Sequence, residues 1–315
     1  MAKRNRAQPP RVGFIGAGNM GRGMAANIMG AGIPLTLVAH HNRAHVDALL
    51  RSGATEVVNP ADLATRCDVA ILCVPGTGQV EDVIFGKDGI VTGGSPGLIV
   101  VDTSTGEPDS TRRRAAALQE HGMALSDAPV SHSPTDAERG QLVSLVGAAD
   151  ETMDVIRPIL ATYSKQIVHF GPAGAGHTAK LVNNFVNHGQ ALLLSEAFAA
   201  CAHGRVDIGK MYEVMRASIS NSGTLQQLVP RMLDGELDGD ELPINDARTE
   251  LEYLRKMVQR DGLNSTMSDA VYQVYNQAVN LGYGDRLMGS LFELQERLSN
   301  AEIVPRQRNR GRKAS

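Results

Sequence analysis

Lys180 and Asn184 are the two residues whose types and spacing best suit chemistry in this sequence. Residues four apart on a helix project from one face, so the pair can act together. A lysine ammonium can stabilise the negative charge that develops on a carbonyl oxygen receiving a hydride, and it can donate a proton to that oxygen. The reverse reaction needs a neutral lysine, so burial or a nearby cation must lower its pKa from about 10.4.

Further polar residues continue this helical face, and the residues alone leave their meaning open. Asn183, Asn187 and His188 form a polar stripe along an otherwise apolar segment. Such a stripe can be a solvated face, an internal hydrogen-bond network or part of a site. Clustered glycines ahead of the lysine favour a site, because they allow close approach of another group and can open a helix. These glycines are Gly171, Gly174 and Gly176.

A glycine-rich loop, GAGNMG, lies between an apolar segment and a helical one. Gly16, Gly18 and Gly21 give it the spacing G-x-G-x-x-G. In dinucleotide-binding loops the first glycine permits a tight turn, the second lets the backbone approach a pyrophosphate, and the third allows close helix–strand packing. The sequence therefore predicts a dinucleotide site. Its residues are Gly16, Ala17, Gly18, Asn19, Met20 and Gly21.

The end of the second predicted strand carries no acidic residue, although NAD-binding units usually hold the ribose hydroxyls there with Asp or Glu. His41, Asn42 and Arg43 stand at this place instead. Arg43 could pair with a 2′-phosphate, with His41 and Asn42 as further donors. The pattern favours NADP as the cofactor and leaves NAD open. The alternative is that all three residues are solvated loop residues.

Short apolar segments alternate with helical patterns through the first half of the chain. They lie at 11–16, 35–39, 69–75 and 97–105. Strands without polar alternation indicate a parallel sheet covered on both faces. Residues 174–203 are apolar almost all round, as in a buried helix, and only helical patterns follow. We therefore expect an α/β protein with a doubly wound domain at 11–172 and an all-helical domain at 173–299.

Composition and charge narrow the classes of partner. The 315 residues are 42% hydrophobic and carry a formal net charge of -3. Basic residues gather at 1–10 and 305–315, which we expect to be disordered tails, and the acidic remainder argues against nucleic acid as the main partner. Three cysteines without CxxC spacing indicate a reducing compartment. With no long apolar segment and no metal-ligand spacing, we expect a cytoplasmic protein without membrane insertion or a metal.

Five motifs occur in order along the chain. They are GFIGAGNMG at 13–21, CVPGTGQVEDVIFG at 73–86, VDTSTGEP at 101–108, DAPVS at 127–131 and GPAGAGHTAKLVNN at 171–184. Together they make residues 11–299 resemble the β-hydroxyacid dehydrogenase family, which includes 3-hydroxyisobutyrate dehydrogenase, tartronate semialdehyde reductase and glyoxylate/succinic semialdehyde reductases. The resemblance implies a Rossmann domain followed by an all-α domain built on a long interdomain helix. It also implies NAD(P)-dependent hydride transfer to or from a small anionic 3-hydroxy acid or semialdehyde.

The resemblance further implies roles for individual residues. Lys180 resembles the family's catalytic general acid/base, Asn184 the amide that steadies the substrate hydroxyl and the lysine, and Ser131 the start of the substrate carboxylate site. Along the cofactor, Thr105 resembles the position beside the nicotinamide, and Val74 and Pro75 resemble lining residues. Because the family buries its long helix between subunits, a homodimer or homotetramer is implied.

Two departures from the family pattern bear on the substrate. His132 and Ser133 stand where the family usually has Gly-Gly, and Thr249 begins the pair that stands where it often has Lys-Asp. We expect His132, Ser133 and Thr249 to shape the substrate pocket, and they leave the identity of the substrate open. Two alternatives remain. One is an imine reductase on the same fold, which typically lacks the lysine; the other is a non-catalytic dinucleotide-binding protein.

Overall fold

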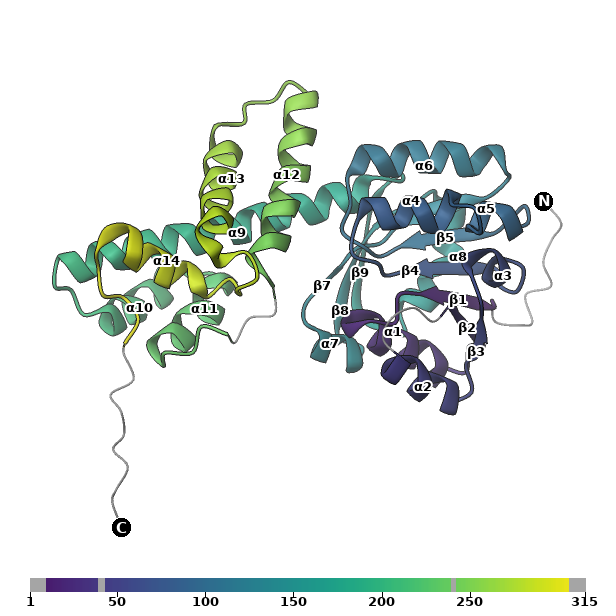
Figure 1. The fold of residues 1–315 in the computed structure, drawn as a ribbon, viewed down its shortest axis with the longest axis horizontal. Coiled ribbons are helices and arrows are strands. Elements are labelled where there is room, and N and C mark those ends of the chain that lie inside the picture. The colour runs from purple at the N-terminus through teal and green to yellow at the C-terminus, as the bar shows by residue number, and fades with distance from the viewer. Residues whose placement is uncertain (1–9, 39–42, 239–241, 306–315) are drawn as a thin grey trace, which may run out of the picture. The chain divides into compact units, whose positions relative to one another are not determined.

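The computed structural model describes residues 10–38, 43–238 and 242–305. The chain divides into two compact units, Met1–Lys180 and Leu181–Ser315. The division falls inside one long helix, α9 (Ala175–His203), which belongs to both units (Figure 1). Among the described residues, no helix has the length and apolar character needed to cross a membrane.

The first unit is built on a nine-stranded sheet with the order β3-β2-β1-β4-β5-β6-β8-β7, in which β9 pairs with β8. The strands are β1 (Val12–Ile15), β2 (Leu35–Val38), β3 (Thr55–Val57), β4 (Val69–Leu72), β5 (Ile99–Asp102), β6 (Ala124–Asp127), β7 (Val130–Ser131), β8 (Leu142–Gly147) and β9 (Ser164–Gly171). From β3 to β6 all pairs are parallel. The carboxyl ends of β1, β4 and β5 therefore meet at one edge of the sheet, where doubly wound folds bind their ligands.

Two pairings depart from the expected parallel sheet. β8 runs antiparallel to both β6 and β7. Only residues 132–141 connect β7 to β8, and a parallel crossover needs a connection of a dozen or more residues, so the chain returns antiparallel. The longer connection through the next helix makes β9 parallel to β8.

Helices cover both faces of this sheet, as Figure 1 shows with α4 to α6 on one side and α1, α2 and α7 on the other. The helices of the first unit are α1 (Asn19–Gly30), α2 (Arg43–Arg51), α3 (Pro60–Ala64), α4 (Thr77–Phe85), α5 (Ile90–Gly93), α6 (Pro108–Glu120), α7 (Pro134–Glu138) and α8 (Asp150–Leu160). Each face has its own core, because successive strand residues point to opposite sides. Phe14 packs into the core under α1, α2, α7 and α8, and Ile15 into the core under α3 to α6.

The second unit is helical. It contains the remainder of α9 with α10 (Ile208–Arg216), α11 (Gly223–Leu233), α12 (Ile244–Arg260), α13 (Thr266–Ala278), the π-helical turn η1 (Val279–Tyr283) and α14 (Ser290–Ser299). Its core is one cluster in which Phe198, Tyr275 and Phe292 are fully buried. Apolar residues remain exposed on α9, so the described residues do not bury this helix all round.

Candidate active site

The glycine loop has the geometry that each of its three glycines predicts. Gly16 has a φ of +101°, and a Cβ there would lie 2.1 Å from the carbonyl oxygen of Cys73. A Cβ on Gly21 would lie 2.1 Å from the carbonyl oxygen of Gly16, whereas one on Gly18 would meet nothing within 4 Å. The first and third glycines are therefore required for the turn and the packing, and the second leaves open space for a ligand.

The opening of α1 presents its backbone N–H groups without competition from side chains. Gly18 is the N-cap residue, no side chain caps the helix, and the first turn holds no acidic residue. Asn19 is exposed, and Ala17 and Met20 are half-buried. Uncapped N–H groups and the positive end of the helix dipole favour a bound phosphate.

The cofactor-lining residues expected beyond the loop follow β4 and β5. The N–H of Val74 donates to Ser104 Oγ at 3.1 Å, which ties these two strand ends together. Val74 and Thr105 are half-buried, and Pro75 is exposed. All three lie at the sheet edge shared with the glycine loop. Burial raises the pKa of the neighbouring Cys73 thiol to about 11, so this thiol stays neutral near pH 7.

Lys180 lies against the segment expected to start the substrate site. Its Nζ donates to the carbonyl oxygen of Val130 at 2.8 Å and lies 3.4 Å from Ser131 Oγ. The lysine is half-buried, as are both partners. The first unit therefore brings together Lys180 and Ser131, which are far apart in the sequence.

The start of α9 is held by a carboxylate that the sequence analysis did not single out. Asp127 accepts from the backbone N–H groups of Gly174 and His177, both at 2.6 Å. Burial raises the pKa of Asp127, and His177 with the two N–H groups opposes that shift. His177 Nε2 in turn donates to the carbonyl oxygen of Ser104 at 2.9 Å. Asp127 and His177 thus fix the start of the helix that carries Lys180. Asp127 is the first residue of the DAPVS motif, and this motif is the sequence feature that could have identified it.

In the second unit, part of the polar stripe on α9 is an internal hydrogen-bond network. Asn184 Nδ2 and His188 Nε2 both donate to Glu250 Oε2 on α12, each at 2.8 Å, and all three residues are buried. Asn183 and Asn187 are exposed. Asn184 Oδ1 accepts from Asn183 Nδ2 at 3.3 Å, so both ends of the Asn184 amide have a partner that fixes its orientation. Glu250 is the second residue of the pair that stands where the family often has Lys-Asp, but its contact with Asn184 was not predicted, because 66 residues separate the two.

The three residues expected to shape the substrate pocket have distinct surroundings. Ser133 is the N-cap of α7 and forms a capping box with Asp136. Thr249 donates its hydroxyl to the carbonyl oxygen of Asn245 in its own helix. His132 is exposed and has a φ of +92°, so it adopts the left-handed conformation that favours glycine. Its backbone therefore keeps a glycine-like shape although its side chain is an imidazole.

Of the residues expected to read the adenosine ribose, His41 and Asn42 lie outside the described residues. Arg43 begins α2 and pairs with two carboxylates, Glu56 and Asp47. These contacts, led by the hydrogen bond from Arg43 to Glu56, raise the pKa of the guanidinium further. The positive charge of the arginine is therefore balanced by two acids, one on its own helix and one on β3.

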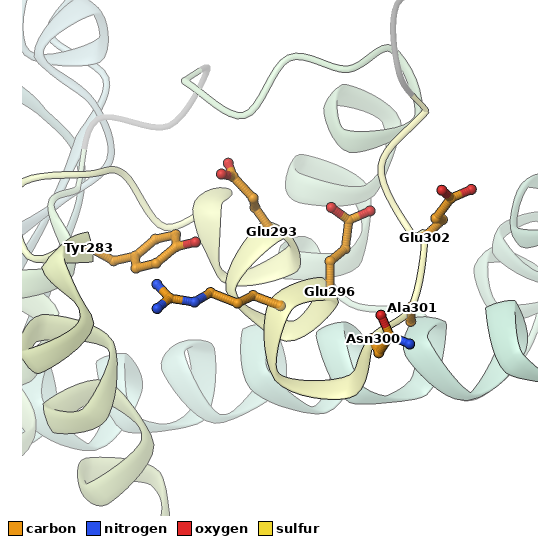
Figure 2. A pocket seen from close by; sticks show the side chains of 7 residues that line it. Tyr283, Glu293, Glu296, Asn300, Ala301 and Glu302 are labelled. Carbon is orange, nitrogen blue, oxygen red and sulfur yellow. The ribbon is translucent and has the colours of Figure 1, made fainter.

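A separate hollow of about 590 Å³ lies beside α14 in the second unit. Figure 2 shows Glu293 and Glu296 projecting from the same side of this helix. Glu296 accepts the backbone N–H groups of Ile303 and Val304, and Glu293 pairs with Arg286. These acids hold the chain's own groups, so we do not place the active site there. Within the described residues, no cluster of His, Cys, Asp and Glu is arranged to hold a metal ion.

Comparison with known proteins decides the family. Residues 11–171 match the NAD binding domain of 6-phosphogluconate dehydrogenase, and residues 174–294 match the NAD-binding of NADP-dependent 3-hydroxyisobutyrate dehydrogenase. The chain belongs to the β-hydroxyacid dehydrogenase family. As a member of this family it is an NAD(P)-dependent oxidoreductase, so the expected enzyme class and cofactor are confirmed.

A curated relative agrees with this assignment, and solved structures share the fold. The NAD-dependent L-serine dehydrogenase of Pseudomonas aeruginosa is 33% identical over 220 residues, which are 70% of this chain and 74% of that protein. The Mycobacterium tuberculosis 3-hydroxyisobutyrate dehydrogenase structure with L-serine has a TM-score of 0.82 at 22% identity and covers 91% of this chain and 99% of its own. A Streptomyces aurantiacus imine reductase matches less well, with a TM-score of 0.59 at 20% identity over 90% of this chain and 99% of its own. The expected Rossmann domain followed by a helical domain is confirmed.

Proposed function

We propose that this dehydrogenase moves a hydride between the nicotinamide of NADP and a small anionic 3-hydroxy acid or its semialdehyde, with Lys180 as the general acid/base. The observation that carries the proposal is the position of the Lys180 ammonium. It lies within hydrogen-bonding reach of Val130 and Ser131, at the segment that resembles the substrate carboxylate site. When bound, the nicotinamide supplies or accepts the hydride at C4.

The protein's own residues supply binding, orientation and the proton. In reduction, the Lys180 ammonium donates a hydrogen bond to the substrate oxygen and then transfers its proton as charge develops there; in oxidation it takes that proton back. Asn184, one turn further along α9, steadies the substrate oxygen through its amide, which Glu250 orients. Ser131 offers a hydroxyl to the substrate carboxylate, and the N–H groups at Gly18 receive the cofactor pyrophosphate.

Three finer features belong to the same proposal. We propose a preference for NADP over NAD, supported by the absence of an acid on β2 and by Arg43 at the start of α2. We also propose a homodimer or homotetramer, supported by exposed valines on α9, and a cytoplasmic location, supported by three unpaired cysteines.

A substrate panel tests the proposal. Oxidation and reduction are followed through the near-ultraviolet absorbance of the reduced nicotinamide, with hydroxy acids, semialdehydes and cyclic imines in parallel. Turnover of a 3-hydroxy acid or its semialdehyde, with no imine reduction, is the expected result. Imine turnover alone would support the imine reductase alternative, and cofactor binding without any turnover would support a non-catalytic role.

A further inference from the structure

Arg43 is held in a fork between two carboxylates at the adenosine end of the proposed cofactor site. Its Nη1 lies 2.5 Å from Glu56 Oε1, and its Nη2 lies 3.3 Å from Glu56 Oε2. The same Nη2 lies 2.9 Å from Asp47 Oδ1. Both ends of the guanidinium are therefore engaged, and Glu56 alone contacts both of them.

The position of Glu56 makes this pairing relevant to the cofactor. In βαβ dinucleotide units, the adenosine ribose is recognised at the end of the second strand. β2 ends at Val38, and its neighbour β3 places Glu56 opposite Leu37, one residue from that end. β2 has no acid at this place, but the adjacent strand β3 has one, Glu56, and that acid contacts Arg43.

The net charge of Arg43, Glu56 and Asp47 affects the binding of NADP and of NAD differently. One guanidinium faces two carboxylates, so the cluster already has more negative than positive charge. A 2′-phosphate brings close to two further negative charges. It competes with both carboxylates for Arg43, because three of the five guanidinium N–H donors already contact Glu56 or Asp47. The 2′-hydroxyl of NAD is neutral and does not compete in this way.

We propose that Glu56 is a specificity-determining residue that sets the ratio of NADP to NAD affinity by competing with the 2′-phosphate for Arg43. The inference rests on the proposed function, because it needs a dinucleotide at this site. Asp47 holds Arg43 less firmly than Glu56 does, since it makes one contact, an i,i+4 pair within the same helix. Glu56 makes two contacts, one from each carboxylate oxygen, which is the bidentate pairing that guanidinium and carboxylate groups favour.

A double-mutant cycle tests this competition. Dissociation constants for NADP and for NAD are measured by titration calorimetry on the full-length wild type, Glu56→Gln, Arg43→Ala and the double variant. We expect Glu56→Gln to tighten NADP binding about tenfold, the scale of one charge-assisted hydrogen bond, with NAD affinity nearly unchanged. In the Arg43→Ala background the same substitution should bring no gain.

A matched control separates competition for Arg43 from a general loss of negative charge. Asp62 is an exposed acid in the first turn of α3 that removes the same charge when changed to Asn. An equal gain in NADP affinity in Asp62→Asn, or a gain that persists without Arg43, would overturn the inference. Weaker NAD binding in Glu56→Gln would also overturn it, because Glu56 would then hold the ribose hydroxyl directly. If the wild type bound neither cofactor, the proposed function itself would be wrong.

Discussion

At the scale of single residues, Lys180 carries the proposed chemistry, and its removal separates catalysis from cofactor binding. Its contacts to Val130 and Ser131 lie at the substrate segment and not at the glycine loop. We expect Lys180→Ala to lower kcat by about 10²-fold or more, because both the proton and the positive charge are lost. The dissociation constant for NADP, measured by titration, should stay within about twofold of wild type. A variant that kept half of the wild-type kcat would make Lys180 an ordinary helix residue.

Cys73 links a single side chain to the pH dependence of stability. Burial raises the pKa of its thiol to about 11 in the folded state, whereas an unfolded thiol titrates near about 8.5. Between these values the unfolded chain has lost a proton that the folded chain keeps, so the free energy of unfolding falls as pH rises. We expect denaturant titrations to show this loss from about pH 8.5 to about pH 11. The loss should be smaller in Cys73→Ala than in wild type; an equal loss in both would assign it to other groups.

At the scale of elements, the turn between β7 and α7 combines a strained residue with a well-formed cap. His132 has a φ of +92°, and the next residue, Ser133, closes the capping box of α7. Glycine would adopt this conformation without strain. We expect His132→Gly to raise the free energy of unfolding by up to about 1 kcal/mol, whereas His132→Ala should not.

The same two variants test whether the imidazole acts on substrates. If His132 contacts the substrate, both variants should change the relative kcat/KM values among acids of different size. Unchanged ratios in both would show that His132 serves only the turn.

The elements also show which features a sequence can predict. The strands at 11–16, 35–39 and 69–75 were expected within one to three residues of β1, β2 and β4, because buried parallel strands are continuous apolar runs. The antiparallel pairs of β8 were not expected, since pairing direction depends on connection length and on neighbours distant in the sequence. α8 was overlooked, although DETMDVIRPIL has helical periodicity and buries Met153 and Ile156.

The candidate site also has features that the sequence can predict and features that it cannot. Gly16, Gly18 and Gly21 could be assigned because each constraint is local to the backbone. The partners of Arg43 and Asn184 could not, because Glu56 and Glu250 reach them only through the tertiary fold. An absence of acid on one strand therefore said nothing about the acid on its neighbour.

At the scale of the whole molecule, one apolar stripe of the second unit is exposed in the part of the chain that the structure describes. Val182, Val186 and Leu193 are 47%, 49% and 62% exposed, and their spacing places them on one face of α9. Nearby, an apolar groove of about 500 Å³ is lined from α9, α12 and α13, with Phe185 and Leu254 among its residues. Contiguous apolar surface of this kind is typical of an interface between proteins.

We expect this stripe to be buried in a homo-oligomer, and a single charge tests it. Multi-angle light scattering of the wild type should give the mass of two or four chains. Val186→Asp should reduce the mass to that of one chain, because a carboxylate buried against apolar surface has no partner to offset its desolvation. Val214→Asp is the matched control, since Val214 is 61% exposed on a different helix, α10, and its variant should keep the wild-type mass. A monomeric wild type, or an unchanged mass in Val186→Asp, would contradict the predicted interface.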